Sequence, residues 1–367
     1  MKYFEKYTSN TTGAAGNQLV FYNTDENEII SSRVFFKITF GGKFNYSFLY
    51  SNTVDSTFYD GSISEADTVV DEWYIDSLSV GVCKSCSRKA CPADGEFEGE
   101  FIPVAFEGSR SKRVAPGEFF ATDEISFSVK AGEFICLEMR FHGKAVPCHE
   151  ETLLPVFKKQ DGEWVENTKI PVPSMIGCDR KVKIRIGFIG DSISQGIGTP
   201  FNSYEHYADI VSRRLGADYS YWDMALGFAR GYDAAKDGAW LFKARQVDVM
   251  CVCFGVNDLL QGYSAEEVKK SLTRIVKKLK ASGVKVIIQT VPPFDYVDKL
   301  VPLWQSVNEY IISELKPLCD GFLDVREFLS ESTGRSHMTV YGCHPDSRGN
   351  ALWGEALSAV LKEVLNN

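Results

Sequence analysis

The sequence predicts two domains of different fold class: an all-β sandwich over residues 1–175, and an α/β domain with a five-stranded parallel sheet over residues 182–367. Three observations support this. The chain has 367 residues, which exceeds the usual size of one domain. Its first part contains short β-branched or aromatic runs separated by turn residues. Beyond residue 182, apolar runs instead alternate with long amphipathic stretches, as in a parallel sheet covered by helices.

The first domain is expected to consist of short strands. Glycine, asparagine, aspartate and serine separate the apolar runs, and neither a long amphipathic helical pattern nor an internal repeat is present. The clearest strand candidates are residues 33–40, 46–50, 101–106, 124–129 and 133–141. Residues 171–178, PVPSMIGC, contain two prolines and a glycine and are interpreted as a linker.

The second domain is expected to alternate strand and helix five times. The expected strand and helix pairs are residues 184–189 with 204–215, 219–226 with 234–246, 247–254 with 265–281, 284–290 with 299–318, and 321–325 with 347–365. Mostly buried strands of this kind form a parallel sheet with helices on both faces. Five strands suit a flavodoxin-like order, in which ligands bind at the carboxyl ends of the strands.

Charge and hydropathy exclude several functions. Lys and Arg total 40 against 49 Asp and Glu, a net charge of −9, so we expect neither a nonspecific nucleic-acid binder nor a basic membrane-surface protein. The first residues, MKYFEKYTSNTTG, lack the apolar core of a secretory signal, and no stretch approaches the roughly 20 apolar residues that span a bilayer. We therefore expect a cytoplasmic protein without a membrane partner.

The ten cysteines are expected to remain thiols. Cys83, Cys86 and Cys91 could begin a zinc site completed by Cys148 or His149. A structural zinc site usually has two close ligand pairs, and the second pair is missing here. The sequence therefore predicts no metal and no other cofactor.

Three polar residues are predicted at one edge of the parallel sheet. Ser192 follows the first strand of the domain, Asn257 follows the third, and His344 precedes the last helix. A serine hydroxyl is a weak nucleophile until a base such as histidine removes its proton. An asparagine amide can donate to the oxyanion that forms when the serine attacks. Together these residues indicate an acyl-transfer site.

Each residue also has a simpler interpretation. Ser192 could cap a helix, Asn257 with Asp258 could form a turn, and His344 could be a structural cap before Pro345. Their occurrence in order along one sheet edge favours the catalytic interpretation. The sequence has no G-x-S-x-G motif and no G-K-[ST] ending, so neither an α/β-hydrolase nucleophile elbow nor a phosphate loop is predicted.

At these residues the sequence resembles the SGNH hydrolases, or GDSL-type esterases and lipases. Residues 190–192 (GDS) match the nucleophile block, residues 255–258 (GVND) the G-x-N-D block, and residues 344–349 the histidine block. The resemblance implies an SGNH fold, Ser192 as nucleophile and His344 as general base. It also implies an oxyanion hole made by the Ser192 N–H, the Asn257 side chain and a glycine N–H, for which Gly227 is our choice.

The sequence departs from the family at two places. The glycine block is D-x-x-x-G-x-x-x-G rather than N-x-G-x-x-G, which leaves Gly231 as an alternative to Gly227. The usual D-x-x-H block has Tyr341 where the aspartate is expected. We therefore predict a Ser192–His344 dyad in which a main-chain oxygen near Tyr341 orients the imidazole. Asp346 is expected to cap the last helix.

Three further residues are predicted to border the substrate: Asp191, Phe294 and Tyr296. The loop 291–296 follows the fourth strand and would supply apolar surface at the same edge, although it could also be a rigid turn whose phenylalanine only packs. His149 is expected in a surface loop and His206 in packing, so neither is expected to be catalytic.

The β-rich first domain resembles the jelly-roll module of some two-domain carbohydrate esterases, including an acetylxylan-type family. This likeness implies a serine esterase that hydrolyses a small acyl, above all acetyl, ester of a carbohydrate. Two alternatives use the same sequence features. One is a glycan- or partner-binding protein with little turnover, and the other is an acyltransferase with an acceptor other than water.

Overall fold

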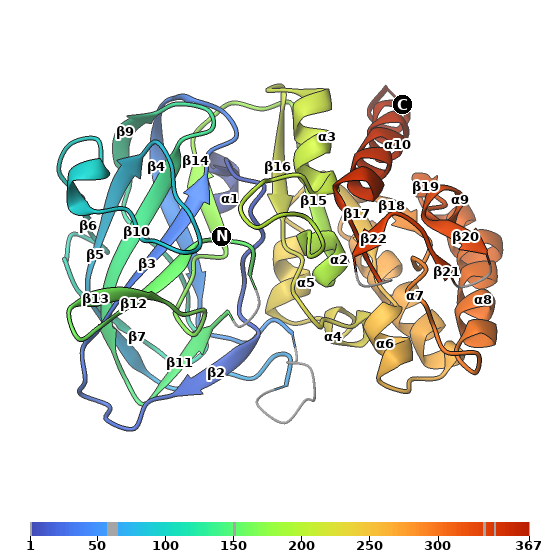
Figure 1. The fold of residues 1–367 in the computed structure, drawn as a ribbon, viewed down its shortest axis with the longest axis horizontal. Helices are drawn as coiled ribbons and strands as arrows, with labels where there is room; N and C mark the ends of the chain where they lie inside the picture. The colour runs from blue at the N-terminus through green and yellow to red at the C-terminus, as the bar shows by residue number, and fades with distance from the viewer. Residues whose placement is uncertain (1, 57–64, 150–151, 333–334, 341–342, 367) are drawn as a thin grey trace. The chain divides into compact units, whose positions relative to one another are not determined.

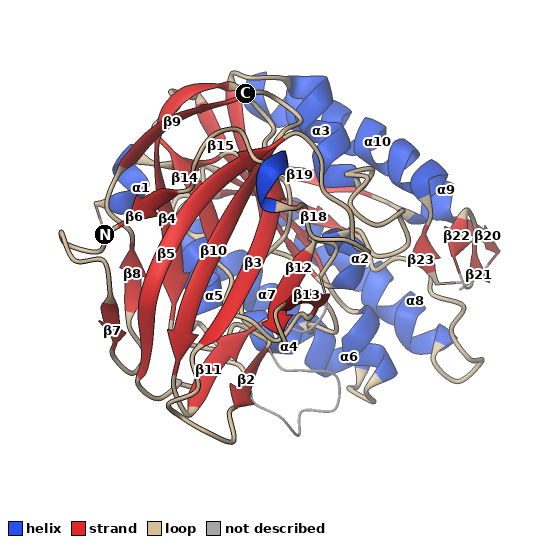
Figure 2. Ribbon diagram, turned by 60° about the vertical axis from the view of Figure 1, so that its left-hand side comes forward, coloured by secondary structure: helices blue, strands red, loops and turns tan. Residues whose placement is uncertain are grey.

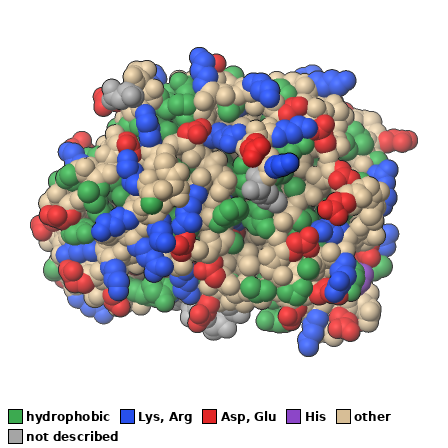
Figure 3. Space-filling model, turned by 180° about the vertical axis from the view of Figure 1, so that it is seen from behind, with side chains coloured by type: hydrophobic (Ala, Val, Ile, Leu, Met, Phe, Trp, Pro, Cys, Tyr) green, Lys and Arg blue, Asp and Glu red, His purple; other side chains and the backbone are tan. Residues whose placement is uncertain are grey.

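The computed structural model describes residues 2–56, 65–149, 152–332, 335–340 and 343–366. The chain divides into two compact units, Met1–Lys181 and Val182–Asn367 (Figure 1). Acidic and basic side chains are interspersed over the face seen in Figure 3. Within the described ranges, no helix is both long enough and apolar enough to cross a membrane.

The N-terminal unit consists of antiparallel sheets, and it confirms the predicted β-sandwich (Figure 2). One sheet has the order β1 (Thr8–Ser9), β14 (Met175–Cys178), β4 (Gly42–Ser51) and β8 (Phe119–Ala121), with β9 (Ile125–Val129) also paired to β4. The other has the order β13 (Glu163–Glu166), β12 (Val156–Gln160), β3 (Ile30–Lys37), β10 (Phe134–His142), β5 (Trp73–Cys83) and β6 (Ile102–Val104), with β7 (Lys112–Val114) paired to β5. The remaining elements are the pair β2 (Leu19–Tyr22) and β11 (Ala145–Cys148) and the short helices α1 (Tyr3–Lys6) and η1 (Asp94–Glu96).

Large aromatic side chains fill the core of this unit. Trp73 and Phe141 meet edge to face with ring centroids 6.1 Å apart, and Phe35 and Phe157 do the same at 5.9 Å. These side chains come from neighbouring strands, so burying them holds the strands together.

Part of the expected linker is a strand, and this prediction is wrong. Residues 175–178 form β14, which is buried and pairs with both β1 and β4. Gly177 is needed there because a Cβ would stand 2.9 Å from the Ser47 carbonyl oxygen, which belongs to the backbone, and 2.1 Å from the Tyr3 hydroxyl. The glycine that suggested a flexible linker therefore serves close packing.

The C-terminal unit has one parallel sheet, and it confirms the predicted flavodoxin-like fold. The strands are β15 (Ile184–Gly190), β16 (Tyr219–Asp223), β17 (Val249–Cys253), β18 (Lys285–Gln289) and β19 (Gly321–Leu323), in the order β16-β15-β17-β18-β19. Every residue of β17 is buried, as expected for an inner strand covered on both faces. The strand order reverses between β15 and β17, and ligands of such sheets bind outside the carboxyl ends of the strands at that point.

Helices cover both faces of this sheet. The longer ones are α3 (Tyr207–Leu215), α5 (Ala239–Ala244), α7 (Ala265–Ala281), α8 (Val301–Tyr310) and α10 (Ser347–Asn366). The short ones are α2 (Ser192–Gln195), α4 (Gly231–Ala234), α6 (Val256–Leu260), α9 (Arg326–Leu329), the π-helical turn η2 (Ile311–Leu315) and the 3-10 turn η3 (Lys316–Leu318). Helices α3 and α10 pack together through the stacked rings of Tyr207 and Trp353, whose centroids are 4.6 Å apart.

Two expected helices are interrupted. The stretch 234–246 is broken between α4 and α5, where Asp237 has a φ of 73° and Gly238 caps α5. The stretch 299–318 changes from α8 to a π-helical turn and then to a 3-10 turn that contains Pro317. In both cases a residue near the break disfavours regular helix.

Short strands connect α9 to α10. They are β20 (Ser330–Ser332), β21 (Arg335–Ser336), β22 (Thr339–Val340) and β23 (His344–Pro345). Strands β20 and β21 pair with each other, as do β22 and β23, so His344 lies opposite Val340.

Candidate active site

Ser192 lies where β15 passes into α2. Asp191 caps this short helix, because its carboxylate accepts the Ile193 N–H at 3.0 Å. Burial raises the pKa of Asp191 to about 7. Its side chain is 2% exposed, so the geometry gives Asp191 a role in shaping the nucleophile turn. It does not place this carboxylate as a surface for substrate.

The Ser192 hydroxyl is paired with His344. Ser192 Oγ lies 2.9 Å from His344 Nε2. With the ring proton on Nδ1, the hydroxyl donates to Nε2, which is the arrangement in which histidine can take the serine proton. Burial lowers the pKa of His344 to about 4. The imidazole is therefore neutral at pH 7 and able to act as a base.

The Asp346 carboxylate makes its hydrogen bonds to the start of helix α10. It accepts the N–H groups of Arg348 and Gly349 at 2.9 and 3.0 Å, and it also forms an ion pair with the Arg348 guanidinium at 2.7 Å. Within the described ranges, no hydrogen bond or ion pair joins His344 to a carboxylate. The predicted main-chain acceptor near Tyr341 lies outside the described residues.

Asn257 is held with its amide at the same sheet edge. It lies in α6, directly after β17 and Gly255, and its Nδ2 donates one hydrogen to the Ala229 carbonyl at 3.0 Å. An amide nitrogen carries two hydrogens, so the second can be offered to an oxyanion. Gly255 permits this entry into α6, because its φ is 127° and a Cβ would stand 2.7 Å from Val291.

The two glycines proposed as oxyanion donors differ in their surroundings. The N–H groups of Met224 and Leu226 donate to Phe188 and Gly190, so the chain runs beside β15 up to residue 226 and reaches Gly227 next to the nucleophile turn. The Gly231 N–H is already committed, because it donates to Asp258 Oδ2 at 2.8 Å. This hydrogen bond argues against Gly231 as the oxyanion donor, and Gly227 stays the predicted donor.

Asp258 is a site-shaping residue that sequence reasoning considered only as part of a turn. Its carboxylate is buried and binds the N–H groups of Gly231 and Tyr232 at the start of α4, and burial raises its pKa to about 6. It therefore ties the loop after β16 to α6, which carries Asn257. Its place in the G-x-N-D block was the available signal.

The two aromatic residues of the loop 291–296 have different roles. Phe294 is half-buried, and its ring meets that of His344 edge to face, with centroids 5.2 Å apart. Tyr296 is 2% exposed and donates its hydroxyl to the Pro292 carbonyl at 3.2 Å. Phe294 therefore borders the dyad, whereas Tyr296 packs beneath the loop.

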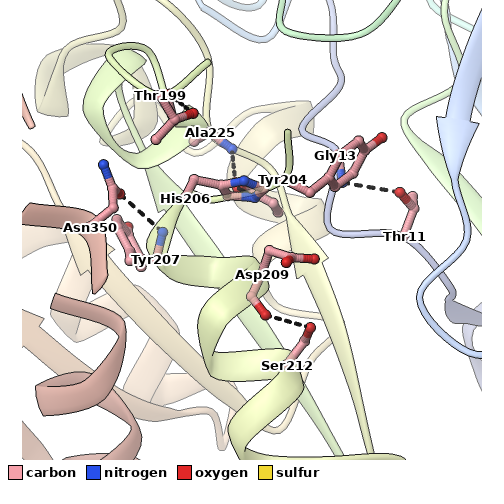
Figure 4. A network of polar contacts seen from close by, with 12 residues as sticks. Thr11, Gly13, Thr199, Tyr204, His206, Tyr207, Asp209, Ser212, Ala225 and Asn350 are labelled. Atoms are coloured by element: carbon pink, nitrogen blue, oxygen red, sulfur yellow. Dashed lines mark hydrogen bonds and ion pairs between the residues drawn. The ribbon is translucent and has the colours of Figure 1, made fainter. Parts of the chain in front are cut away.

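His206 packs at the start of α3, as expected. It is buried, and its Nε2 lies 3.7 Å from Asp223 Oδ2. The next residue, Tyr207, donates its N–H to Asn350 of α10 at 3.0 Å (Figure 4). These contacts join α3, α10 and the end of β16.

His149 and the cysteine cluster around Cys83 and Cys91 belong to the N-terminal unit. His149 is 1% exposed, and its Nδ1 is 2.7 Å from the Gly16 carbonyl, so the expected surface loop is wrong. Cys83 is buried at the end of β5, and Cys91 accepts a contact from Arg33. Among the described residues, no group of three or more His, Cys, Asp or Glu side chains is arranged to hold a metal ion.

Comparisons with known proteins were made for both sequence and structure. Residues 188–352 match the model of the GDSL-like Lipase/Acylhydrolase family. No curated protein sequence matches the chain significantly.

Three solved structures illustrate the structural similarity. A member of the lipolytic protein G-D-S-L family from Veillonella parvula is 19% identical, covering 48% of this chain and 98% of its own, with a TM-score of 0.42. The psychrotrophic esterase EstA from a Pseudoalteromonas species is 18% identical, covering 50% and 99%, with a TM-score of 0.41. The acetyl xylan esterase AlAXEase is 23% identical, covering 48% and 98%, with a TM-score of 0.39.

The family match spans the nucleophile turn, the Asn257 helix and the His344 segment, all of which belong to the C-terminal unit. Residues 188–352 thus belong to the GDSL-like lipase/acylhydrolase family, and the protein is a carboxylic ester hydrolase.

Proposed function

We propose that this protein hydrolyses a small acyl ester of a carbohydrate, with acetyl as the acyl group, through an acyl-enzyme on Ser192. The observation that carries the proposal is the 2.9 Å contact between Ser192 Oγ and His344 Nε2. It pairs a nucleophile with a base that burial keeps neutral at pH 7.

The reaction proceeds in two halves. Ser192 Oγ attacks the ester carbonyl carbon while His344 Nε2 takes the hydroxyl proton. The oxyanion is held by the N–H groups of Ser192 and Gly227 and by the Asn257 amide. The C–O bond to the sugar then breaks, and the protonated imidazole gives its proton to the departing alcohol. A water molecule then attacks the acyl-enzyme while His344 takes its proton. The bond between the acyl carbon and Ser192 Oγ breaks, and the imidazolium gives the proton to Oγ, which releases the carboxylic acid and free Ser192.

Two observations support a small acyl group on a sugar. The Phe294 ring lies against the imidazole, so the space beside the reacting atoms is bounded by an apolar wall. The chain combines an antiparallel β-sandwich with a GDSL-like hydrolase domain, which is the combination that the sequence resemblance to two-domain carbohydrate esterases implies.

The test is an ester screen with purified protein and with the Ser192→Ala variant as blank. We expect release of acetate from p-nitrophenyl acetate and from acetylated xylo-oligosaccharides, with rates that fall for butyrate and octanoate esters. Faster hydrolysis of the long-chain esters contradicts the acetyl assignment. No hydrolysis of any ester by folded protein at any pH favours a binding protein. Transfer of acetate to an added sugar in preference to water identifies an acyltransferase.

A further inference from the structure

A tight glycine turn follows the nucleophile helix. Gly196 ends α2 with a φ of 104°, and Gly198 has a φ of 105°. The Thr199 N–H and hydroxyl both donate to the Gly196 carbonyl, at 3.1 and 2.7 Å, and close the turn. The N–H groups of Gly196 and Ile197 donate to the Ser192 carbonyl at 3.1 and 2.9 Å. The position of this turn is therefore fixed relative to the nucleophile.

The same turn is in contact with the segment that carries the base. A Cβ at Gly198 would stand 2.5 Å from the Pro345 carbonyl oxygen and 2.9 Å from His344 Cβ. The first of these atoms belongs to the backbone, and Cβ is fixed to the backbone, so neither can move aside by a side-chain rotation. A residue larger than glycine must displace strand β23 or the turn itself.

We infer that Gly198 is a positioning residue that sets the separation between Ser192 and His344. This inference rests on the proposed function of the dyad. The turn is attached to Ser192 through α2 and touches His344 directly, so the absence of a side chain at residue 198 lets β23 approach until Nε2 is 2.9 Å from Oγ. Gly198 itself does not touch the reacting atoms.

The need for a positive φ does not by itself account for this role. Gly216 at the end of α3 has a φ of 83°, and a Cβ there would meet nothing within 4 Å. Gly216→Ala therefore adds backbone strain without a steric contact, whereas Gly198→Ala adds strain together with a displacement of the base. The two substitutions form a matched pair within one unit.

The experiment compares wild-type protein, Gly198→Ala and Gly216→Ala in hydrolysis of p-nitrophenyl acetate from pH 4 to pH 8, in fluorophosphonate labelling and in thermal unfolding. We expect Gly198→Ala to lower kcat and the labelling rate about 10²-fold, the loss typical of a reacting group misplaced by about 1 Å, with KM nearly unchanged. The acidic limb of its pH–rate profile should move to higher pH. A displaced imidazole gains contact with water, which raises its pKa toward the ordinary value. Gly216→Ala should lower Tm but keep wild-type kinetics.

A second variant covers the case in which Gly198→Ala does not fold. Thr199→Val removes the side-chain hydrogen bond of the turn, keeps the bond from the residue 199 N–H to the Gly196 carbonyl, and adds no atom at residue 198. We expect it to give a smaller decrease in kcat and the same direction of shift in the acidic limb. Wild-type kcat and an unshifted limb in whichever of the two variants folds overturn the inference. The absence of hydrolysis and labelling in wild-type protein instead overturns the proposed function, so the two failures are distinguishable.

Discussion

Two segments of the C-terminal unit meet at the contact between Ser192 and His344, and they are held by different interactions. The nucleophile segment, residues 190–199, continues β15, which pairs with β16 on one side and β17 on the other. The described residues of the histidine segment, 335–340 and 343–346, contain the two-residue strands β21, β22 and β23. Single hydrogen bonds anchor it to other segments, such as the bond from the Ser336 N–H to Asp295 Oδ1 at 2.7 Å and the bond from the His337 N–H to the Leu329 carbonyl at 2.6 Å.

This difference means that the nucleophile and the base are positioned by different parts of the structure. The position of the nucleophile follows from the register of an inner strand and from the Asp191 cap of α2, so it is supported by the sheet itself. The position of the base depends on a few contacts in an irregular segment, so small changes there can alter catalysis in a folded protein. The predictions below test this division, beginning with the largest effect.

Removing the nucleophile should abolish the chemistry and leave the fold intact. We expect Ser192→Ala to lower kcat at least about 10⁴-fold and to prevent fluorophosphonate labelling, because no acyl-enzyme can form. Tm should stay near the wild-type value, since one hydroxyl contributes little to stability. Ser194→Ala, two residues along in the same turn, should still be labelled. Labelling that persists in Ser192→Ala would falsify the assignment of the nucleophile.

Removing the Asn257 amide tests the part of the site that bridges β17 and the loop after β16. We expect Asn257→Ala to lower kcat about 10²- to 10³-fold with little change in KM, because the amide is aimed at charge that develops in the transition state. Steady-state kinetics with p-nitrophenyl acetate measure both constants. An increase confined to KM would instead make Asn257 a substrate-binding residue.

Catalysis should tolerate loss of the Asp346 carboxylate, which is the carboxylate nearest to His344 in the sequence. We expect Asp346→Asn to keep kcat within about tenfold of wild type, well short of the roughly 10⁴-fold loss that follows removal of an orienting aspartate. The matched control is Ser264→Ala, which removes the cap of α7 and should lower stability by about 1 kcal/mol without affecting kcat. A loss of several thousandfold in folded Asp346→Asn would show that this carboxylate orients the base.

The pH profile should show the smallest change. In the proposed mechanism His344 acts as the base in its neutral form, and burial lowers its pKa to about 4. kcat/KM should therefore stay nearly constant between pH 7 and pH 5 and fall as the pH drops through 4, where the imidazole becomes protonated. Asp191, with a pKa raised to about 7 by burial, can add its own inflection, so the profile should be repeated with Asp191→Asn. An acidic limb near pH 6.5 in both proteins contradicts a buried base.

Local signals made most of the fold predictable. The apolar run in β17 and the capping box of Ser264 and Glu267 at the start of α7 are each complete within a few residues. Strand β5 was missed because its sequence, WYIDSLSVGVC, places aspartate, serine and glycine among its apolar residues. What fixes it as a strand is its pairing with β10, which lies far along the chain.

The site was predictable to the extent that short motifs define it. Ser192 and His344 were each chosen from local sequence, and the fold brings them within 2.9 Å of each other. The contact of Gly198 with Pro345 and the hydrogen bond from Asn257 to Ala229 join residues that are distant in sequence. No local sequence pattern predicts such contacts. The assignment of catalytic roles stays a prediction that the variants above test.

The pairing of β1 with β14 has a consequence for how the N-terminal unit is made. Thr8 lies opposite Cys178 and Ser9 opposite Gly177, so the first strand of the unit is paired with its last. During synthesis the chain emerges from its N-terminus, and contacts of such long sequence separation form late. This sheet therefore closes only after Cys178 has left the ribosome. A fragment that ends before Met175 leaves β1 and one edge of β4 without their strand partner, and an unpaired edge is open to association with other chains.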